Sequence, residues 1–185
     1  MVTQHSQPAI SGFRCDNSGH SLAFYPILRS PAVSETEIRQ LVDYTMQTKR
    51  SSRICLHESP DDELQFMIIA QYKGFDSAQP LMRVHRMKEK VFQPIFGRLL
   101  MICSSPSGQI ENEKILDPEK GGVQLISKGQ FYNDFPLDEV TVHSEFVLGP
   151  FNSNLDREFP VMPWDISISE KKNFYDSCIK RAEGP

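Results

Sequence analysis

The sequence predicts a mainly β protein, one domain of antiparallel strands closed into a barrel or sandwich, with helices only at its ends. Three observations lead to this fold class. Between residues 52 and 148, short apolar segments recur, and turn sequences such as Pro-Ser-Gly and Gly-Gly separate them. Helical periodicity is confined to one segment before this region and one after it. The chain has 185 residues, of which 39% are hydrophobic, and is long enough to bury one core without disulfides.

Residues 1–33 are expected to form a partly ordered N-terminal arm, and residues 34–185 a single domain. The arm is rich in Ser, Gln, Pro and Gly and has no sustained hydrophobic period. Its apolar patch at 22–25 is still able to pair as an outer strand.

Two helices are predicted, one at each end of the domain. The first covers about residues 35–48, where Ser34 and Glu37 have the spacing of a capping box. The second is a short helix at about 169–181. Apolar residues recur at helical spacing in both: Ile38, Leu41, Val42 and Met46 in the first, and Phe174, Cys178 and Ile179 in the second.

The strands lie between these helices. Residues 64–72 show the pattern best, because alternate positions from Leu64 to Tyr72 are all apolar, as in a strand with at least one buried face. Further strands are predicted at 79–87, 90–96, 98–104, 111–116, 122–127 and 139–148.

Charge and composition exclude several classes of function. A net charge of −4 and a pI near 5.7 argue against general nucleic-acid binding. No apolar run approaches the roughly 20 residues needed to span a membrane, and no secretory signal is recognisable, so a cytoplasmic location is expected. The four cysteines lack the spacing of a zinc site and are expected to be free thiols.

Three motifs in a fixed order indicate a family. They are Leu-His-Glu-Ser-Pro-Asp-Asp at 56–62, Arg-Val-His-Arg-Met-Lys-Glu-Lys-Val-Phe at 83–92 with Phe-Gly-Arg-Leu at 96–99, and Gly-Pro-Phe at 149–151. Through them, residues 35–165 resemble the WbuC-like cupins, small barrels often associated with bacterial surface-polysaccharide gene clusters. The resemblance implies a cupin-type, jelly-roll-like antiparallel β-barrel with an internal pocket, and a homodimer.

The resemblance also implies a metal site, but the sequence departs from the family at most ligand positions. His85 matches the first family histidine. Met87 stands at the second, Lys90 replaces a glutamate, and Tyr132 falls where the last histidine is expected. A thioether, an ammonium and a phenol are poor ligands for zinc, iron or manganese, and Lys90 would repel a cation. A degenerate site without a metal cofactor is therefore expected.

His85 and Tyr132 are the predicted catalytic residues, as base and acid. Arg83 and Lys90 are predicted to clamp an anion, with Met87 beside them in the ligand site. Together they predict a pocket protein that binds, or acts by acid–base chemistry on, a small anionic metabolite such as a sugar or nucleotide sugar. Each residue also fits a structural role: a core histidine, a half-buried tyrosine, or a basic strand face in solvent.

Two alternatives stay open. A cupin without catalytic activity, serving as a binding or regulatory subunit, is consistent with lost ligands and no replacement motif, and an exposed apolar sheet face would mark it. The other alternative keeps a metal, with ligands drawn from His57, His85, His143 and Glu145. Alternation places His143 opposite an apolar set of positions on its strand, so it points to solvent if that set faces inward.

Overall fold

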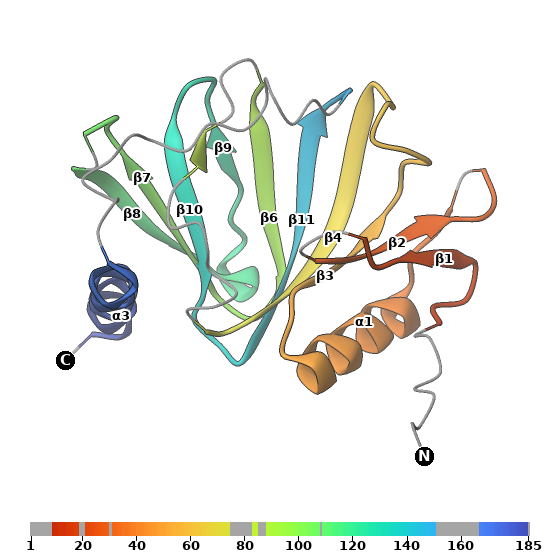
Figure 1. The fold of residues 1–185 in the computed structure, drawn as a ribbon, viewed down its shortest axis with the longest axis horizontal. Coiled ribbons are helices and arrows are strands. Elements are labelled where there is room, and N and C mark those ends of the chain that lie inside the picture. The colour runs from red at the N-terminus through yellow and green to blue at the C-terminus, as the bar shows by residue number, and fades with distance from the viewer. Residues whose placement is uncertain are drawn as a thin grey trace.

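The computed structural model describes residues 9–18, 21–29, 31–74, 83–84, 88–107, 109–150 and 167–184, with Arg83 described in its backbone only. Within these ranges lie two α-helices, one short 3₁₀ helix and the strands β1 to β11 (Figure 1). Their bounds are α1 Glu35–Thr48, α3 Ile168–Glu183, the 3₁₀ helix Pro118–Lys120, β1 Phe13–Asp16, β2 Leu22–Pro26, β3 Ser52–Cys55, β4 Leu64–Tyr72, β5 Arg83–Val84, β6 Lys90–Phe96, β7 Leu99–Ser104, β8 Ile110–Leu116, β9 Gln124–Ile126, β10 Phe131–Pro136 and β11 Val140–Leu148.

The strands form two sheets that face each other. The larger sheet has the order β1-β2-β3-β4-β11-β6-β9, and the smaller has the order β5-β10-β7-β8. All neighbouring strands are antiparallel except β2 and β3, which run parallel. Counted from β4 as the first strand to β11 as the eighth, the two sheets have the orders 1-8-3-6 and 2-7-4-5, which is a jelly roll. The predicted class, a cupin-type antiparallel barrel with a helix at each end, is confirmed.

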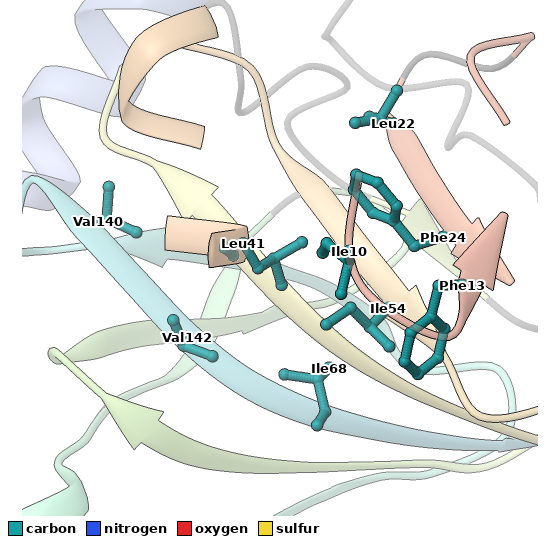
Figure 2. Close-up of a cluster of buried hydrophobic side chains, with 10 residues drawn as sticks. Ile10, Phe13, Leu22, Phe24, Leu41, Ile54, Ile68, Val140 and Val142 are labelled. Carbon is teal, nitrogen blue, oxygen red and sulfur yellow. The ribbon is translucent and has the colours of Figure 1, made fainter. Parts of the chain in front are cut away.

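Helix α1 has the predicted bounds and covers part of the outer face of the larger sheet (Figure 1). Both halves of its capping box form: the Ser34 hydroxyl accepts the Thr36 backbone N–H, and the Glu37 carboxylate accepts the Ser34 backbone N–H at 2.7 Å. Leu41 is fully buried against the sheet. Figure 2 shows the core around it, which contains Ile10, Phe13, Leu22, Phe24, Ile54, Ile68, Ala70, Val140 and Val142.

The described part of the N-terminal arm belongs to the larger sheet. The patch at 22–25 pairs, as β2, with β3, and β1, which the sequence did not indicate, pairs with β2. Phe13 and Phe24 enter the same core as Leu41 (Figure 2). The arm therefore supplies one side of the pocket into which α1 packs.

Helix α3 covers the outer face of the smaller sheet. It extends beyond the predicted 169–181 at both ends and begins with a second capping box, made by Ser167 and Glu170. Its apolar face packs on β7 and β10 through Tyr175, Cys178, Ile179, Leu100, Ile102 and Phe135. No helix in the described ranges is long and apolar enough to cross a membrane.

Most predicted strands form, and β10, like β1, was not predicted. The segments at 90–96, 98–104, 111–116, 122–127 and 139–148 contain β6, β7, β8, β9 and β11. Of the segment at 79–87, only β5 falls within the described residues. Strand β10 has no alternation in its sequence because α3 covers one of its faces and the barrel interior encloses the other.

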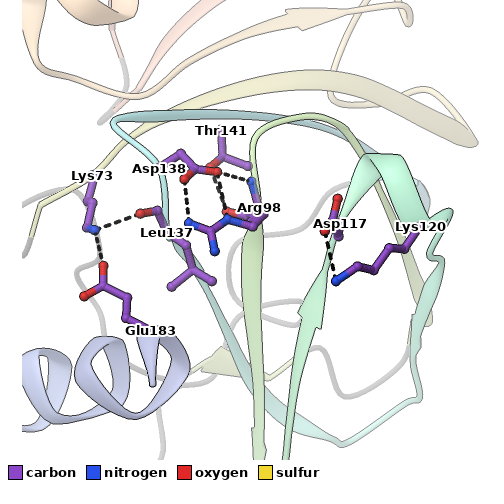
Figure 3. Close-up of polar contacts among 8 residues, drawn as sticks. All are labelled: Lys73, Arg98, Asp117, Lys120, Leu137, Asp138, Thr141 and Glu183. Atoms are coloured by element: carbon purple, nitrogen blue, oxygen red, sulfur yellow. Dashed lines mark hydrogen bonds and ion pairs between the residues drawn. The ribbon is translucent and has the colours of Figure 1, made fainter. Parts of the chain in front are cut away.

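The turn between β6 and β7 joins the two sheets (Figure 3). Asp138 accepts the Arg98 backbone N–H at 2.7 Å and its guanidinium at 2.8 Å, and this hydrogen bonding lowers the pKa of the Asp138 carboxyl. The Arg98 carbonyl accepts from the Leu137 backbone N–H and from the Thr141 hydroxyl. Gly97 makes this possible, because it has a φ of 68° and a Cβ there would lie 2.8 Å from the Val140 carbonyl oxygen.

We expect Gly97→Ala to lower the free energy of unfolding by about 2–4 kcal/mol, through left-handed backbone strain and the contact with the β11 backbone. Gly129→Ala is the matched control, because Gly129 has a φ of 74° but open space around its Cβ direction. It should cost about 1–2 kcal/mol, from strain alone. The free energy of unfolding of each variant is measured by urea titration. Equal losses in the two variants would contradict the close approach of Gly97 to the Val140 carbonyl.

Candidate functional site

A buried ion pair lies between the two sheets. Lys90 at the start of β6 and Glu145 on β11 project from adjacent strands into the barrel, and Lys90 Nζ lies 2.5 Å from Glu145 Oε1. Their side chains are only 9% and 6% exposed. Charged side chains are almost never this buried unless they are paired, and here each supplies the other's countercharge.

Aromatic rings and an imidazole surround this pair. The Phe92 ring lies 5.7 Å from the Tyr132 ring and 5.5 Å from the His143 ring, between centroids. Lys90 Nζ lies 6.0 Å from the centroids of both Phe92 and Tyr132, within the range of cation–π attraction. We call Lys90, Phe92, Tyr132, His143 and Glu145 the interior cluster.

A second polar contact crosses the barrel beside the interior cluster. Gln71 on β4 donates a hydrogen bond to the carboxylate of Asp134 on β10, and Asp134 is 2% exposed. Asp134 is two residues from Tyr132 and therefore faces the same side of its strand. This contact could not be predicted from a local pattern, because 63 residues separate its partners.

The structure brings together two of the five predicted site residues, Lys90 and Tyr132. His85 and Met87 lie outside the described residues. Arg83 is described only in its backbone, which pairs with that of Tyr132 in the register of β5 and β10. Lys90 points into the barrel, as a ligand-binding role requires. Its carboxylate partner, Glu145, was not predicted from the sequence.

The signal for that partner was present in β11, where His143 and Glu145 stand two residues apart. His143 would point to solvent only if the apolar set with Val140 and Val142 faced the interior, and this condition is not met. Val140 and Val142 face α1, while His143 is fully buried and Glu145 is 4% exposed on the barrel side. A strand covered on both faces has no solvent side, so alternation does not tell inside from outside.

His57 lies at another place on the larger sheet. Its Nδ1 donates to the Phe66 carbonyl at 3.2 Å, and its ring meets Tyr25 edge-on at 5.9 Å between centroids. Burial is the main cause that lowers the pKa of His57. The neighbouring turn has a structural role, because the Asp62 carboxylate accepts the backbone N–H groups of Glu58 and Ser59.

The described part of the interior does not fit a divalent metal. Lys90 places an ammonium in the interior cluster, and the carboxylate beside it, Glu145, is hydrogen-bonded to it. Among the described residues, no three His, Cys, Asp or Glu side chains converge. Within the described residues, His57 therefore does not converge with His143 and Glu145, and His85, the fourth candidate ligand of that alternative, lies outside them.

Comparison with known proteins adds distant likenesses only. No family model matches the sequence, and no curated protein does. CapF crystallised with the inhibitor 3-isopropenyl-tropolone is 22% identical, with a TM-score of 0.48, over 60% of this chain and 32% of that one. The capsular polysaccharide assembling protein CapF from Staphylococcus aureus is 20% identical, with a TM-score of 0.47, over 58% of this chain and 31% of that one.

KdgF from Halomonas sp. is 12% identical, with a TM-score of 0.41, over 56% of this chain and 82% of that one. The chain thus spans about a third of the length of CapF and most of the length of KdgF. At such identities and TM-scores the likenesses assign no family and no activity. The assignment of the fold rests on the strand order described above.

The interior ion pair can be tested by a double-mutant cycle. Lys90→Met and Glu145→Leu should each lower the free energy of unfolding by about 3–5 kcal/mol, because each leaves one buried charge without its partner. The double variant should recover most of that loss. Lys114→Met, at an exposed position of β8, is the control and should change little. Losses that simply add in the double variant would show that the two side chains do not interact.

His57 should make stability depend on pH. Since burial lowers its pKa below the ordinary 6.5, the unfolded chain binds a proton more readily than the folded one below that pH. Its contribution to stability is complete above pH 6.5 and falls as the pH drops toward the pKa of the folded state. Urea titrations at several pH values should show a smaller loss for His57→Gln than for the parent. If the free energy of unfolding falls equally with pH in both proteins, a lowered pKa of His57 is excluded.

Proposed function

We propose that this protein binds a small anionic metabolite, such as a sugar phosphate or a nucleotide sugar, inside the jelly-roll barrel beside Lys90. The observation that carries the proposal is the ammonium of Lys90 in the interior cluster. The finer assignment to a WbuC-like cupin, on the motifs at 56–62, 83–99 and 149–151, belongs to the same proposal.

The donors of Lys90 are suited to an anion. An ammonium has three N–H donors, and Glu145 accepts one of them. No other residue in the described part of the chain is seen to accept from it. A phosphate or carboxylate oxygen entering the barrel would find a charged donor already fixed in place by Glu145 and by the Phe92 and Tyr132 rings. Arg83, on the strand that pairs with β10 at Tyr132, would supply the second cation.

The same arrangement would serve acid–base chemistry. In the proposed reaction, the His85 imidazole takes a proton from a carbon next to a substrate carbonyl, and the electron pair moves onto the carbonyl oxygen. Lys90 then stabilises the enolate oxygen, and the Tyr132 hydroxyl returns a proton to carbon. Neither oxidant nor metal takes part, and the products are isomers or epimers of the substrate.

A second candidate function is favoured by a different observation. Tyr132 is fully buried, and its ring packs in a cluster of large apolar side chains. A residue buried in this way is better suited to line and support a binding site than to contact a substrate directly. A cupin that binds its ligand without turnover, as a regulatory or binding subunit, uses the same Lys90 contact and needs no proton transfer.

Ligand binding can be measured by calorimetry with UDP-glucose, glucose 1-phosphate and uncharged glucose as probes. We expect at least one anionic probe to bind and glucose not to bind. The Lys90→Met, Glu145→Leu double variant, which keeps its interior uncharged, should weaken binding by at least tenfold, and Lys114→Met should not. Equal binding by the double variant would exclude the proposed site, and failure of both anionic probes would count against it.

Turnover and metal content separate the two functions from the metal alternative. Isomerisation of glucose 6-phosphate, whose open-chain form has the carbonyl that the reaction requires, would support the acid–base reaction if it is lost in His85→Ala and Tyr132→Phe. Tight binding without turnover would support the binding subunit. Elemental analysis of protein purified without chelator decides the remaining point: near-stoichiometric metal that disappears in His85→Ala would overturn the proposal of a metal-free site.

A further inference from the structure

The inner face of the larger sheet continues beyond the barrel onto β3, β2 and β1. Glu145, Met67 and Cys55 stand opposite one another on β11, β4 and β3, so the side that lines the barrel on β11 carries Cys55 on β3. Tyr25 on β2 packs in one cluster with Met67 and Cys55, and Arg14 is its register partner on β1. Figure 1 shows β1 and β2 on the side of the molecule away from β7 and β8. This extension of the sheet therefore has an inner face that lies outside the barrel.

Three side chains with titratable or charged groups surround Tyr25 on this face. The Arg14 guanidinium lies over the ring, with its Cζ 4.9 Å from the ring centroid, and the His57 ring meets Tyr25 edge-on at 5.9 Å between centroids. Arg53 stands two residues before Cys55 and therefore points to the same side of β3. Burial raises the pKa of the Tyr25 hydroxyl, and the nearby charge of Arg53 acts against that change. We call Arg14, Tyr25, Arg53 and His57 the arginine site.

The two guanidiniums of the arginine site donate to uncharged groups. Arg14 Nη2 donates to the Glu58 backbone carbonyl at 3.2 Å, and Arg53 Nη1 donates to the Ser21 hydroxyl at 2.9 Å. Among the residues that the structure describes, no carboxylate forms an ion pair with either guanidinium. Two cations on neighbouring parts of one sheet face therefore lack a direct countercharge.

Asp16 offsets only part of this positive charge. Its carboxylate accepts the Ser18 backbone N–H at 2.9 Å, and the hydrogen bonding with Ser18 is the main cause that lowers the pKa of Asp16. The charges of Arg14 and Arg53 contribute less to that shift, as expected for groups that are near the carboxylate but not in contact with it. One carboxylate beside two guanidiniums leaves an excess of positive charge at this place, in a chain whose net charge is −4.

Arg53 is the residue that points most directly to a ligand. Its side chain is half-buried, and its Nε is buried without a hydrogen-bond acceptor among the described residues. A buried donor without an acceptor costs about 1–3 kcal/mol. Since Ser21 occupies only Nη1, the edge of the guanidinium formed by Nε and Nη2 keeps two parallel donors. Such an edge matches two oxygens of one phosphate or carboxylate group.

We propose that the arginine site binds a phosphate group of a small molecule, held between Arg14 and Arg53 beside Tyr25. A phosphate dianion has enough charge and enough oxygens to accept from both guanidiniums at once, whereas a carboxylate balances only one of them. The site is separate from Lys90, because β4 and β11 lie between β3 and β6 in the larger sheet. It gives the chain a second place for an anion and does not depend on the function proposed for the barrel interior.

The test is the binding of inorganic phosphate to the whole chain at constant ionic strength, with the His57 imidazole as the reporter. A phosphate bound beside Tyr25 should raise the pKa of His57, measured by NMR of 15N-labelled histidine, by about 0.5 or more, because a nearby negative charge favours the imidazolium. Acetate should raise it less. Arg53→Met should abolish this shift and weaken phosphate binding, measured by calorimetry, about tenfold or more. Arg14→Met should have the same effect, and its exposed position makes it the variant to use if Arg53→Met does not fold.

Arg39→Met is the matched control. Arg39 is an exposed arginine on α1 that pairs with Glu35, so its loss should change neither the affinity nor the His57 pKa. The Lys90→Met, Glu145→Leu double variant should still show the His57 shift, even if it no longer binds the sugar probes. Loss of the shift in that variant would assign the phosphate to the barrel interior and overturn the inference. A His57 pKa that phosphate does not change in the parent, or a shift that survives both arginine variants, would overturn it as well.

Discussion

The first part of strand β11, from Val140 to Glu145, is enclosed on all sides, and this constraint shapes the rest of the molecule. Hydrogen bonds to β4 and β6 occupy its edges, α1 covers its Val142 face, and the smaller sheet closes over its Glu145 face. A charged or polar side chain that points inward from such a strand has no access to bulk water and must find its partner inside the barrel. Glu145 finds Lys90 on the adjacent strand, so the site and the core are built from the same residues.

The jelly roll leaves two outer faces to be covered, and the chain covers them with its two ends. Both helices begin with a capping box, so each can form before it docks. The N-terminal arm extends the larger sheet and provides Phe13 and Phe24 for α1 to pack on. Helix α3 covers β7 and β10 completely enough to bury Phe135.

Whether a feature could be predicted from the sequence depends on how far apart in the chain its interacting residues lie. The helices were predictable because Ser34, Glu37 and the apolar residues that follow act within a few residues of one another. Strand β10 was not, because burial on both faces removes the alternation by which a strand is recognised. The pairing of Lys90 with Glu145 spans 55 residues and depends on the register of β6 and β11, which no local pattern specifies. An inward position for Lys90 could still be predicted, because the resemblance to WbuC-like cupins places it where an inward-facing ligand is expected.

A buried ion pair is a costly way to fill a barrel, since two well-packed apolar side chains would be at least as stable. Its presence beside His143 and Tyr132 is therefore better explained by a ligand that needs a fixed charge than by the stability of the core.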